Sequence, residues 1–160
     1  MSLSVGDRFV DVTLYDSNRE QKSISSFLQS GPIVLAFYPG AFTGVCDKEV
    51  CSLRDSMTRY SEIGATVIGI SVDGPFALKE FAAKYQLNFP LLSDFQRVAT
   101  EAYGVAFKNL GGVEGYVVAN RSVFVIDADG VIRYTWAASP NPGVEPNYDE
   151  LVSTVASLKS

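Results

Sequence analysis

The feature that most constrains the fold is the stretch Tyr-Pro-Gly-Ala-Phe-Thr-Gly-Val-Cys at residues 38–46. It follows an unbroken apolar run at residues 33–37 and leads into a segment whose apolar residues recur at helical spacing. This order predicts a buried strand, a tight loop and the start of a helix. Cys46 is therefore expected in the first turn of that helix, where the backbone N–H groups have no intrahelical partners and the helix dipole is positive.

A thiol in the first turn of a helix has a chemical consequence. The partial positive charge there favours the thiolate over the thiol, which makes Cys46 a candidate nucleophile. The alternative is that Cys46 is a small buried hydrophobic residue, as free cysteines often are. Two neighbours favour the nucleophile: the Thr43 hydroxyl can reach a bound oxygen atom or the thiolate, and Pro39 fixes φ and shields the loop from water.

Pro39, Thr43 and Cys46 form a Pro-x-x-x-Thr-x-x-Cys pattern that resembles the active-site motif of the peroxiredoxins. The flanking residues look most like the alkyl hydroperoxide reductase E-like branch, and the resemblance runs from Val5 to the C-terminal helix. It implies an α/β fold of the thioredoxin-like type with an N-terminal β-hairpin extension. It also implies an antioxidant enzyme of cell redox homeostasis, a thiol-dependent peroxidase that reduces hydrogen peroxide and organic hydroperoxides. In such an enzyme the Cys46 thiolate becomes a sulfenic acid.

The resemblance also implies a role for Arg121, which stands immediately before an apolar run at residues 122–127. The family uses an arginine at the start of a distant strand to hold the thiolate and orient the peroxide. The chain contains no histidine, so any cation that supports Cys46 must be an arginine or a lysine. Without the motif, Arg121 would be interpreted as a charge on a solvated loop. Arg54 is a weaker second candidate, for which an ion pair with Asp55 is an equally good interpretation.

The same reasoning predicts how a peroxide would be bound. The Thr43 hydroxyl and the backbone N–H groups of Cys46 and Val45 are the groups expected to bind the peroxide oxygens. Donors along the axis of the breaking O–O bond stabilise the transition state more than the ground state, which raises the rate.

The second cysteine, Cys51, leaves two interpretations open. Its position five residues after Cys46 coincides with that of the resolving cysteine in many Q-type peroxiredoxins, which form an intrachain disulfide. In an intact helix five residues rise about 7.5 Å and turn about 140°, so the Cα atoms lie beyond the roughly 7 Å limit for a disulfide. Bridging therefore requires the first helical turns to unwind. Because the E-like branch commonly has one cysteine, Cys51 is otherwise a buried apolar residue.

Composition and charge exclude other classes of function. The chain of 160 residues has the size of a single domain, residues 1–160, with 47% hydrophobic and 19% charged residues. Its net charge is −5 without a basic cluster, so no nucleic-acid partner is expected. No apolar run approaches the roughly 20 residues that span a bilayer, and the N-terminus lacks a leader pattern. We therefore expect a cytoplasmic protein without a membrane partner.

The sequence also argues against a cofactor or a resident metal. Without histidine, the two cysteines fall short of the four ligands of a structural zinc site. The glycines match neither dinucleotide-binding nor phosphate-binding loops. The expected partners are the peroxide substrate and a thioredoxin-like or low-molecular-weight thiol reductant. The resemblance further suggests a homodimer or larger homo-oligomer, with Phe42 and Phe107 as candidate interface residues.

Periodicity and turn residues predict the remaining elements. Strands and helices alternate through the centre of the chain, which implies right-handed parallel crossovers. The expected elements are a hairpin of residues 9–15 and 21–24, a helical turn at 25–28, a strand at 33–37, a helix from 46 to Gly64, a strand at 66–72, a helix opened by Pro75, an extended piece at 88–94, a helix at 97–103, an irregular stretch at 104–120, a hairpin of 122–127 and 131–136, a loop at 139–147 and a helix at 148–158. The expected inward face of the helix after Pro75 is formed by Phe76, Leu78, Phe81, Ala82 and Tyr85. The isomer of the bond before Pro90 is left open.

Two other functions remain open from the sequence. A thiol-disulfide oxidoreductase on the same fold would normally carry Cys-x-x-Cys and would not require Thr43 or Arg121. A non-enzymatic redox sensor or chaperone would instead use oxidation of Cys46 to switch partners.

Overall fold

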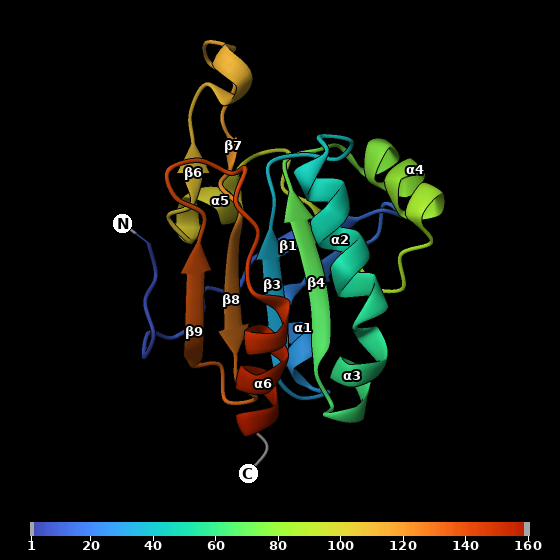
Figure 1. Cartoon of the computed structure of the whole chain (residues 1–160), viewed down its shortest axis with the longest axis vertical. Helices are drawn as coiled ribbons and strands as arrows, with labels where there is room; N and C mark the ends of the chain where they lie inside the picture. The colour runs from blue at the N-terminus through green and yellow to red at the C-terminus, as the bar shows by residue number, and fades with distance from the viewer. Residues whose placement is uncertain (1, 159–160) are drawn as a thin grey trace.

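The computed structural model describes residues 2–158, apart from the side chain of Cys46. A seven-stranded sheet in the order β2-β1-β5-β4-β3-β8-β9 forms its centre (Figure 1). Its strands are β1 (Thr13–Asp16), β2 (Gln21–Ser23), β3 (Ile33–Phe37), β4 (Thr66–Ser71), β5 (Leu91–Ser93), β8 (Ser122–Ile126) and β9 (Ile132–Ala137). The three central strands β3, β4 and β5 are parallel, and the outer strands pair antiparallel. The predicted parallel core with an N-terminal hairpin and a second hairpin near the C-terminus is confirmed.

Helices cover both faces of the sheet (Figure 1). They are α1 (Ile24–Leu28), α2 (Val45–Asp55), α3 (Met57–Glu62), α4 (Pro75–Tyr85), α5 (Val98–Ala102) and α6 (Tyr148–Ser157). Strand β3 is buried along its whole length, as its apolar run predicts. Its alternate residues enter two hydrophobic clusters: Val34 and Ala36 pack with residues of α2, α3, α4 and α6, and Ile33, Leu35 and Phe37 pack with residues of α1 and α5.

The helix predicted from residue 46 to Gly64 is two helices. Helix α2 ends at Asp55 and α3 begins at Met57. At the intervening Ser56, the backbone N–H is shared between the carbonyls of Ser52 and Leu53, the bifurcated pattern common at helix ends. The expectation of one helix was therefore wrong, because a hydrophobic stripe does not reveal a local change in backbone hydrogen bonding.

The inward face predicted for α4 is correct in part. Leu78 and Phe81 are fully buried, and Ala82 and Tyr85 pack partly buried against the same cluster. Phe76 is instead 67% exposed. Its ring lies 5.0 Å from the guanidinium of Arg19, so the first turn of α4 places this aromatic ring at the surface against a cation.

The stretch predicted to be irregular, residues 104–120, contains a small hairpin that we call the arm (residues 106–119). It consists of β6 (Ala106–Phe107) paired antiparallel with β7 (Val118–Ala119), joined through the 3-10 turn η1 (Leu110–Gly112). Figure 1 shows the arm projecting beyond the end of the main sheet. Strands of two residues are too short to produce a period in the sequence, which is why the prediction was wrong here.

The sequence left open the isomer of the peptide bond before Pro90. Among residues 2–158, the bond in the cis form is Ser139–Pro140. The bond before Pro90 is therefore trans. In the same range, no helix has the length and apolar character needed to cross a membrane.

Candidate active site

The loop between β3 and α2 is anchored by a carboxylate from the neighbouring strand. Oδ2 of Asp73, just beyond β4, accepts hydrogen bonds from the Ala41 backbone N–H and from the Ser71 hydroxyl, both at 2.7 Å. The Tyr38 N–H continues the ladder to the Ile70 carbonyl at 3.0 Å. The motif loop is thus fastened to the end of β4 at the carboxyl edge of the parallel core.

Phe42 has a conformation that only its surroundings explain. Its φ is 63°, a region that a bulky residue rarely adopts. Its ring meets that of Phe81 edge to face at 5.1 Å, and Nζ of Lys84 lies 5.4 Å from it. These contacts with α4 hold the turn that presents Thr43.

The hydrogen of the Thr43 hydroxyl is committed to a backbone carbonyl. The hydroxyl donates a hydrogen bond to the Gly40 carbonyl at 2.7 Å. The lone pairs of Oγ1 therefore remain available as an acceptor. The Val45 N–H donates to the Thr43 carbonyl at 3.0 Å, so the expectation that this group is a free donor for a peroxide was wrong.

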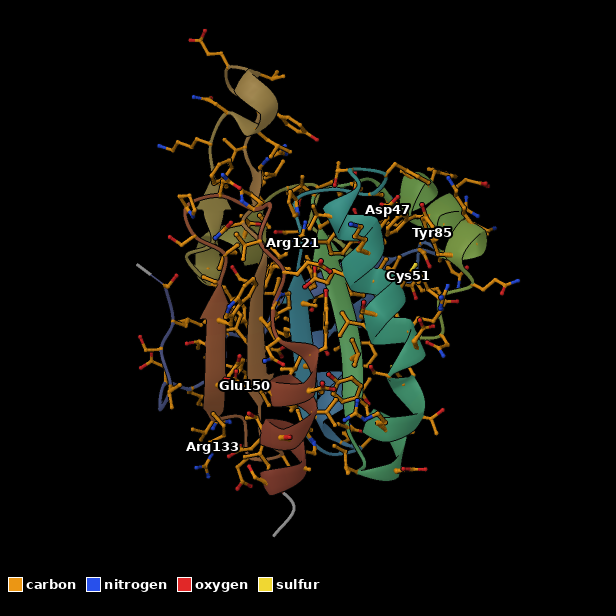
Figure 2. All side chains as sticks on the ribbon, viewed as in Figure 1. Asp47, Cys51, Tyr85, Arg121, Arg133 and Glu150 are labelled. Carbon is orange, nitrogen blue, oxygen red and sulfur yellow. The ribbon has the colours of Figure 1, made fainter. Side chains whose placement is uncertain are left out.

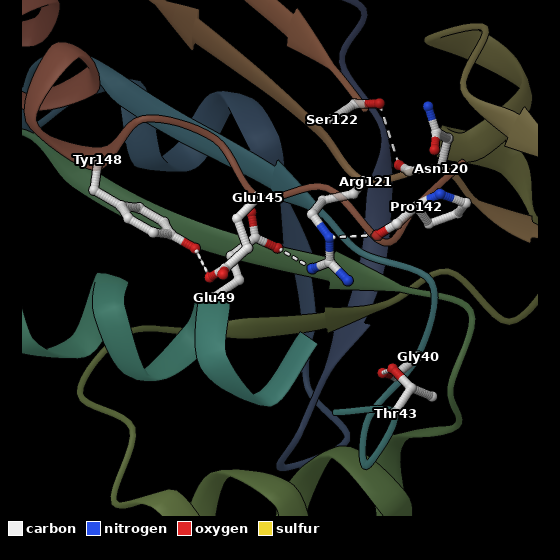
Figure 3. Close-up of polar contacts among 9 residues, drawn as sticks. All are labelled: Gly40, Thr43, Glu49, Asn120, Arg121, Ser122, Pro142, Glu145 and Tyr148. Carbon is white, nitrogen blue, oxygen red and sulfur yellow. Dashed lines mark hydrogen bonds and ion pairs between the residues drawn. The ribbon is translucent and has the colours of Figure 1, made fainter. Parts of the chain in front are cut away.

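Arg121 immediately precedes β8 and is 1% exposed. Its Nη1 lies 2.7 Å from Oε1 of Glu49, and its Nε donates to the Pro142 carbonyl at 2.8 Å (Figure 3). A buried guanidinium with two fixed contacts is not a charge on a solvated loop, so that alternative is wrong. Figure 3 shows the end of its guanidinium group directed toward the loop that carries Thr43.

Glu49 is the residue that sequence reasoning missed, because its charge suggested a solvated face of α2. It is completely buried, one turn after Cys46. Burial raises its pKa from 4.5 to about 7; the charge and hydrogen bond of Arg121 oppose this shift, and the charge of Glu145 adds to it. Oε2 of Glu49 has no hydrogen-bond partner among the described residues. The spacing of three residues from the predicted nucleophile, which is close to one helical turn, was the available signal.

A pocket of ≈ 270 Å³ lies over these groups. It is lined by Pro39, Thr43, Val45, Phe107, Leu110, Gly111, Arg121, Asn141, Pro142 and Gly143. The structure therefore brings together three predicted site residues: Pro39 and Thr43 from the motif loop and Arg121 from a distant part of the chain. The side chain of Cys46 lies outside the described residues, and its backbone lies in the first turn of α2, next to pocket-lining Val45.

Cys51 belongs to a different environment. It is a half-buried free thiol within the continuous helix α2, on the side facing α4 (Figure 2). There the Tyr85 hydroxyl donates to Oδ2 of Asp47 at 2.5 Å, and Nη1 of Arg54 donates to the Tyr85 carbonyl at 2.5 Å. The hydrogen bond to Asp47 raises the pKa of Tyr85, and burial and the charges of Asp47 and Cys51 add to the shift.

Arg54 does not reach the pocket. Its Nε and Nη2 both lie 2.9 Å from Oδ1 of Asp55, so its interpretation as an ion-pair residue is confirmed. Among the described residues, no group of three or more His, Cys, Asp or Glu side chains is arranged to hold a metal ion.

Comparison with known proteins assigns this architecture to a family. Residues 5–135 match the profile of the AhpC/TSA family. The chain belongs to the AhpC/TSA family. The alkyl hydroperoxide reductase E of Mycobacterium tuberculosis is 34% identical over 140 residues, covering 86% of this chain and 88% of that protein. A chloroplastic peroxiredoxin Q of Oryza sativa is 35% identical over 156 residues, covering 98% of this chain and 68% of that protein.

Solved structures of AhpC/TSA relatives confirm the fold of this peroxiredoxin. The crystal structure of peroxidoxin BcpB from Mycobacterium tuberculosis is 31% identical, covers 98% of both chains and superposes with a TM-score of 0.86. A peroxiredoxin-like protein from Aquifex aeolicus is 30% identical, covers 99% of this chain and 89% of its own, and has a TM-score of 0.85. The thioredoxin-like fold and the class of activity, a thiol-dependent peroxidase, are thus confirmed. The disulfide oxidoreductase and sensor alternatives are not favoured.

Proposed function

We propose that Cys46, Thr43, Pro39 and Arg121 form the peroxidatic site of this enzyme. One observation carries the proposal: a single pocket joins Pro39, Thr43 and Arg121 beside the first turn of the helix that contains Cys46. A helix start favours a thiolate, and a buried guanidinium supplies the cation that the absence of histidine requires.

The oxidation step is a displacement at oxygen. The Cys46 sulfur attacks one peroxide oxygen, the O–O bond breaks, and hydroxide or alkoxide leaves and takes a proton to become water or an alcohol. Cys46 is left as a sulfenic acid. Because the Thr43 hydroxyl hydrogen is directed at Gly40, its oxygen accepts the hydrogen of the peroxide. Negative charge moves from sulfur to the departing oxygen, where Arg121 and the Cys46 N–H stabilise it.

Glu49 acts through Arg121 in this scheme. Its buried carboxyl group contacts Nη1 and the Pro142 carbonyl accepts a hydrogen bond from Nε, so the guanidinium plane has a fixed orientation. A group that is oriented before the substrate arrives does not need to reorganise during the reaction. Glu49 is thus a positioning residue.

The recycling step begins when a thiol condenses with the sulfenic acid, releasing water and forming a disulfide. We propose Cys51 or an external thiol for this step, followed by reduction by a thioredoxin-like or low-molecular-weight thiol. Helix α2 is continuous through both cysteines, so use of Cys51 requires its first turns to unwind.

The setting proposed for this cycle is a single domain of residues 1–160 in the cytoplasm, assembled as a homodimer or larger homo-oligomer. Phe42, 48% exposed at the edge of the motif loop, supports an interface near the pocket, whereas half-buried Phe107, the other candidate, lines the pocket itself. Size-exclusion chromatography with light scattering, repeated on a Phe42→Ser variant, tests the assembly.

The experiment that tests the function is stopped-flow oxidation of the reduced protein by hydrogen peroxide, an organic hydroperoxide and peroxynitrite. We expect rapid consumption by wild type, loss of at least about 1,000-fold for Cys46→Ser, and an unchanged oxidation rate for the matched variant Cys51→Ser. Full peroxidase activity in Cys46→Ser would contradict the proposal.

A further inference from the structure

The pocket is larger than a peroxide group requires. A water molecule occupies about 30 Å³ in the liquid, and hydrogen peroxide has only two heavy atoms. The pocket measures ≈ 270 Å³, several times the volume of that molecule. Most of its space is therefore available to the rest of an organic substrate.

The chemistry of the wall is divided. Thr43 and Arg121 supply polar groups at the end near α2, whereas the arm supplies Phe107 and Leu110. Both arm side chains are half-buried, so each keeps apolar surface that a bound molecule would cover. A hydroperoxide has the same division, with a polar O–O–H group at one end and an apolar substituent at the other.

Hydrogen bonds fix the shape of the arm and attach its base. The Leu110 N–H donates a hydrogen bond to the Tyr116 carbonyl at 3.2 Å, and the Leu110 carbonyl accepts one from the Val113 N–H at 3.1 Å. At the base of the arm, Nε of Arg97 donates to the Val117 carbonyl at 2.9 Å. The apolar wall is thus set by the arm's own backbone and by α5, independently of the motif loop.

We infer that the arm is the specificity element of this enzyme and selects hydroperoxides with an apolar substituent over hydrogen peroxide. The inference rests on the proposed function, since it places the O–O–H group between Thr43 and Arg121. The substituent then lies against Phe107 and Leu110. Each methylene that remains buried in the transition state increases the rate about fourfold over hydrogen peroxide.

The test uses two substitutions on the same arm. Leu110→Ser removes an apolar side chain from the pocket wall. Val113→Ser makes a similar change at a residue that is 57% exposed and does not line the pocket. Reduced wild type and each variant are oxidised in single turnover by cumene hydroperoxide and by hydrogen peroxide. The ratio of the two rate constants is then compared between each variant and wild type.

We expect the ratio of the cumene hydroperoxide rate constant to the hydrogen peroxide rate constant to fall about tenfold in Leu110→Ser. In Val113→Ser the ratio should stay within about twofold of wild type. In a third variant, Leu110→Met, which keeps an apolar side chain, most of the wild-type ratio should be retained. Single turnover excludes any effect on recycling by thiols. A ratio for Leu110→Ser within about twofold of wild type, or an equal fall in Val113→Ser, overturns the inference. These outcomes differ from failure of the proposed function, in which wild type itself would be oxidised by neither peroxide.

Discussion

The two sides of helix α2 differ in how they are held. On the pocket side, Glu49 and Arg121 form an ion pair whose side chains are 0% and 2% exposed, and Arg121 continues to the Pro142 carbonyl. On the α4 side, Cys51 lies beside the Asp47–Tyr85 hydrogen bond and near the Arg54–Asp55 ion pair, whose side chains are 29% and 68% exposed.

This difference corresponds to two demands on one helix. Reduction of a peroxide needs groups that do not move, and buried charge-assisted contacts provide them. Recycling through Cys51 needs the first turns of α2 to unwind, and the side chains that contact one another on the α4 side are more exposed to water than Glu49 and Arg121. Changes on the pocket side should therefore affect the oxidation rate, whereas changes on the α4 side should affect formation of the disulfide.

The largest effect is expected at Arg121. Lysine would keep the charge in Arg121→Lys but cannot hold Glu49 and the Pro142 carbonyl together as the guanidinium does. We expect the stopped-flow rate constant with hydrogen peroxide to fall about 100-fold. The matched change Arg133→Lys, at a side chain that is 54% exposed and paired with Asp127, should leave it unchanged. A rate for Arg121→Lys within about threefold of wild type would contradict the claim that fixed contacts on the pocket side of α2 determine the oxidation rate.

The second prediction concerns Glu49 and pH. Since burial raises its pKa to about 7, folded protein retains a proton between pH 4.5 and about 7 that the unfolded chain has lost. Its contribution to stability is fully present below pH 4.5 and is lost as the pH rises through about 7. Glutamine cannot ionise, so Glu49→Gln should remove up to about 3 kcal/mol of this decline.

Urea unfolding at about pH 5 and about pH 7.5 measures that decline. The control is Glu150→Gln, at an exposed position in the first turn of α6, which should keep the wild-type difference. Equal pH dependence in wild type and Glu49→Gln would show that Glu49 titrates normally in the folded protein.

The third prediction addresses the α4 side. Tyr85→Phe removes the hydrogen bond to Asp47 and keeps the ring, so unwinding of α2 should become easier. We expect about three- to tenfold faster loss of the Cys51 thiol after one equivalent of peroxide, measured by acid quench and thiol counting. Tyr15→Phe, at a 39% exposed residue of β1, is the control. An unchanged rate would show that the Tyr85–Asp47 hydrogen bond does not oppose unwinding of α2. Persistence of the Cys51 thiol would rule out its resolving role.

The smallest effect is expected on the outer surface of α4. Because Phe76 is 67% exposed, Phe76→Ser should change the free energy of unfolding by less than about 0.5 kcal/mol. Phe81→Ala on the buried side should cost about 3–5 kcal/mol and loosen the support of Phe42. Urea titration of both variants measures the contrast. A similar cost for the two would mean that Phe76 is covered in the assembled protein.

The parts of the fold that could be predicted are those with long, regular patterns. The apolar run of β3, the proline that opens α4 and the Asp129-Gly130 turn between β8 and β9 each indicate an element by a local rule. The arm could not be predicted, because its paired strands have only two residues each. The break at Ser56 depends on a shared hydrogen bond that leaves the hydrophobic stripe intact.

The site shows the same division between local and tertiary information. The positions of Pro39 and Thr43 follow from one contiguous motif, and the absence of histidine directed attention to Arg121. Glu49 and Asp73 were missed, because a carboxylate is normally interpreted as solvated. Only the packing of α2 and β4 against distant segments shows that one is buried with Arg121 and the other anchors the motif loop.

The central claim, that Cys46 is the residue oxidised by peroxide, can be measured directly by trapping the sulfenic acid. Reduced protein is mixed with one equivalent of peroxide and a dimedone-type trap, digested with trypsin and analysed by mass spectrometry. Cleavage after Lys22, Lys48 and Arg54 separates Cys46, on residues 23–48, from Cys51, on residues 49–54. The account predicts the adduct on residues 23–48 in Cys51→Ser, in which no second thiol of the chain can consume the sulfenic acid. An adduct confined to residues 49–54 in wild type, or none on Cys46 in Cys51→Ser, would contradict it.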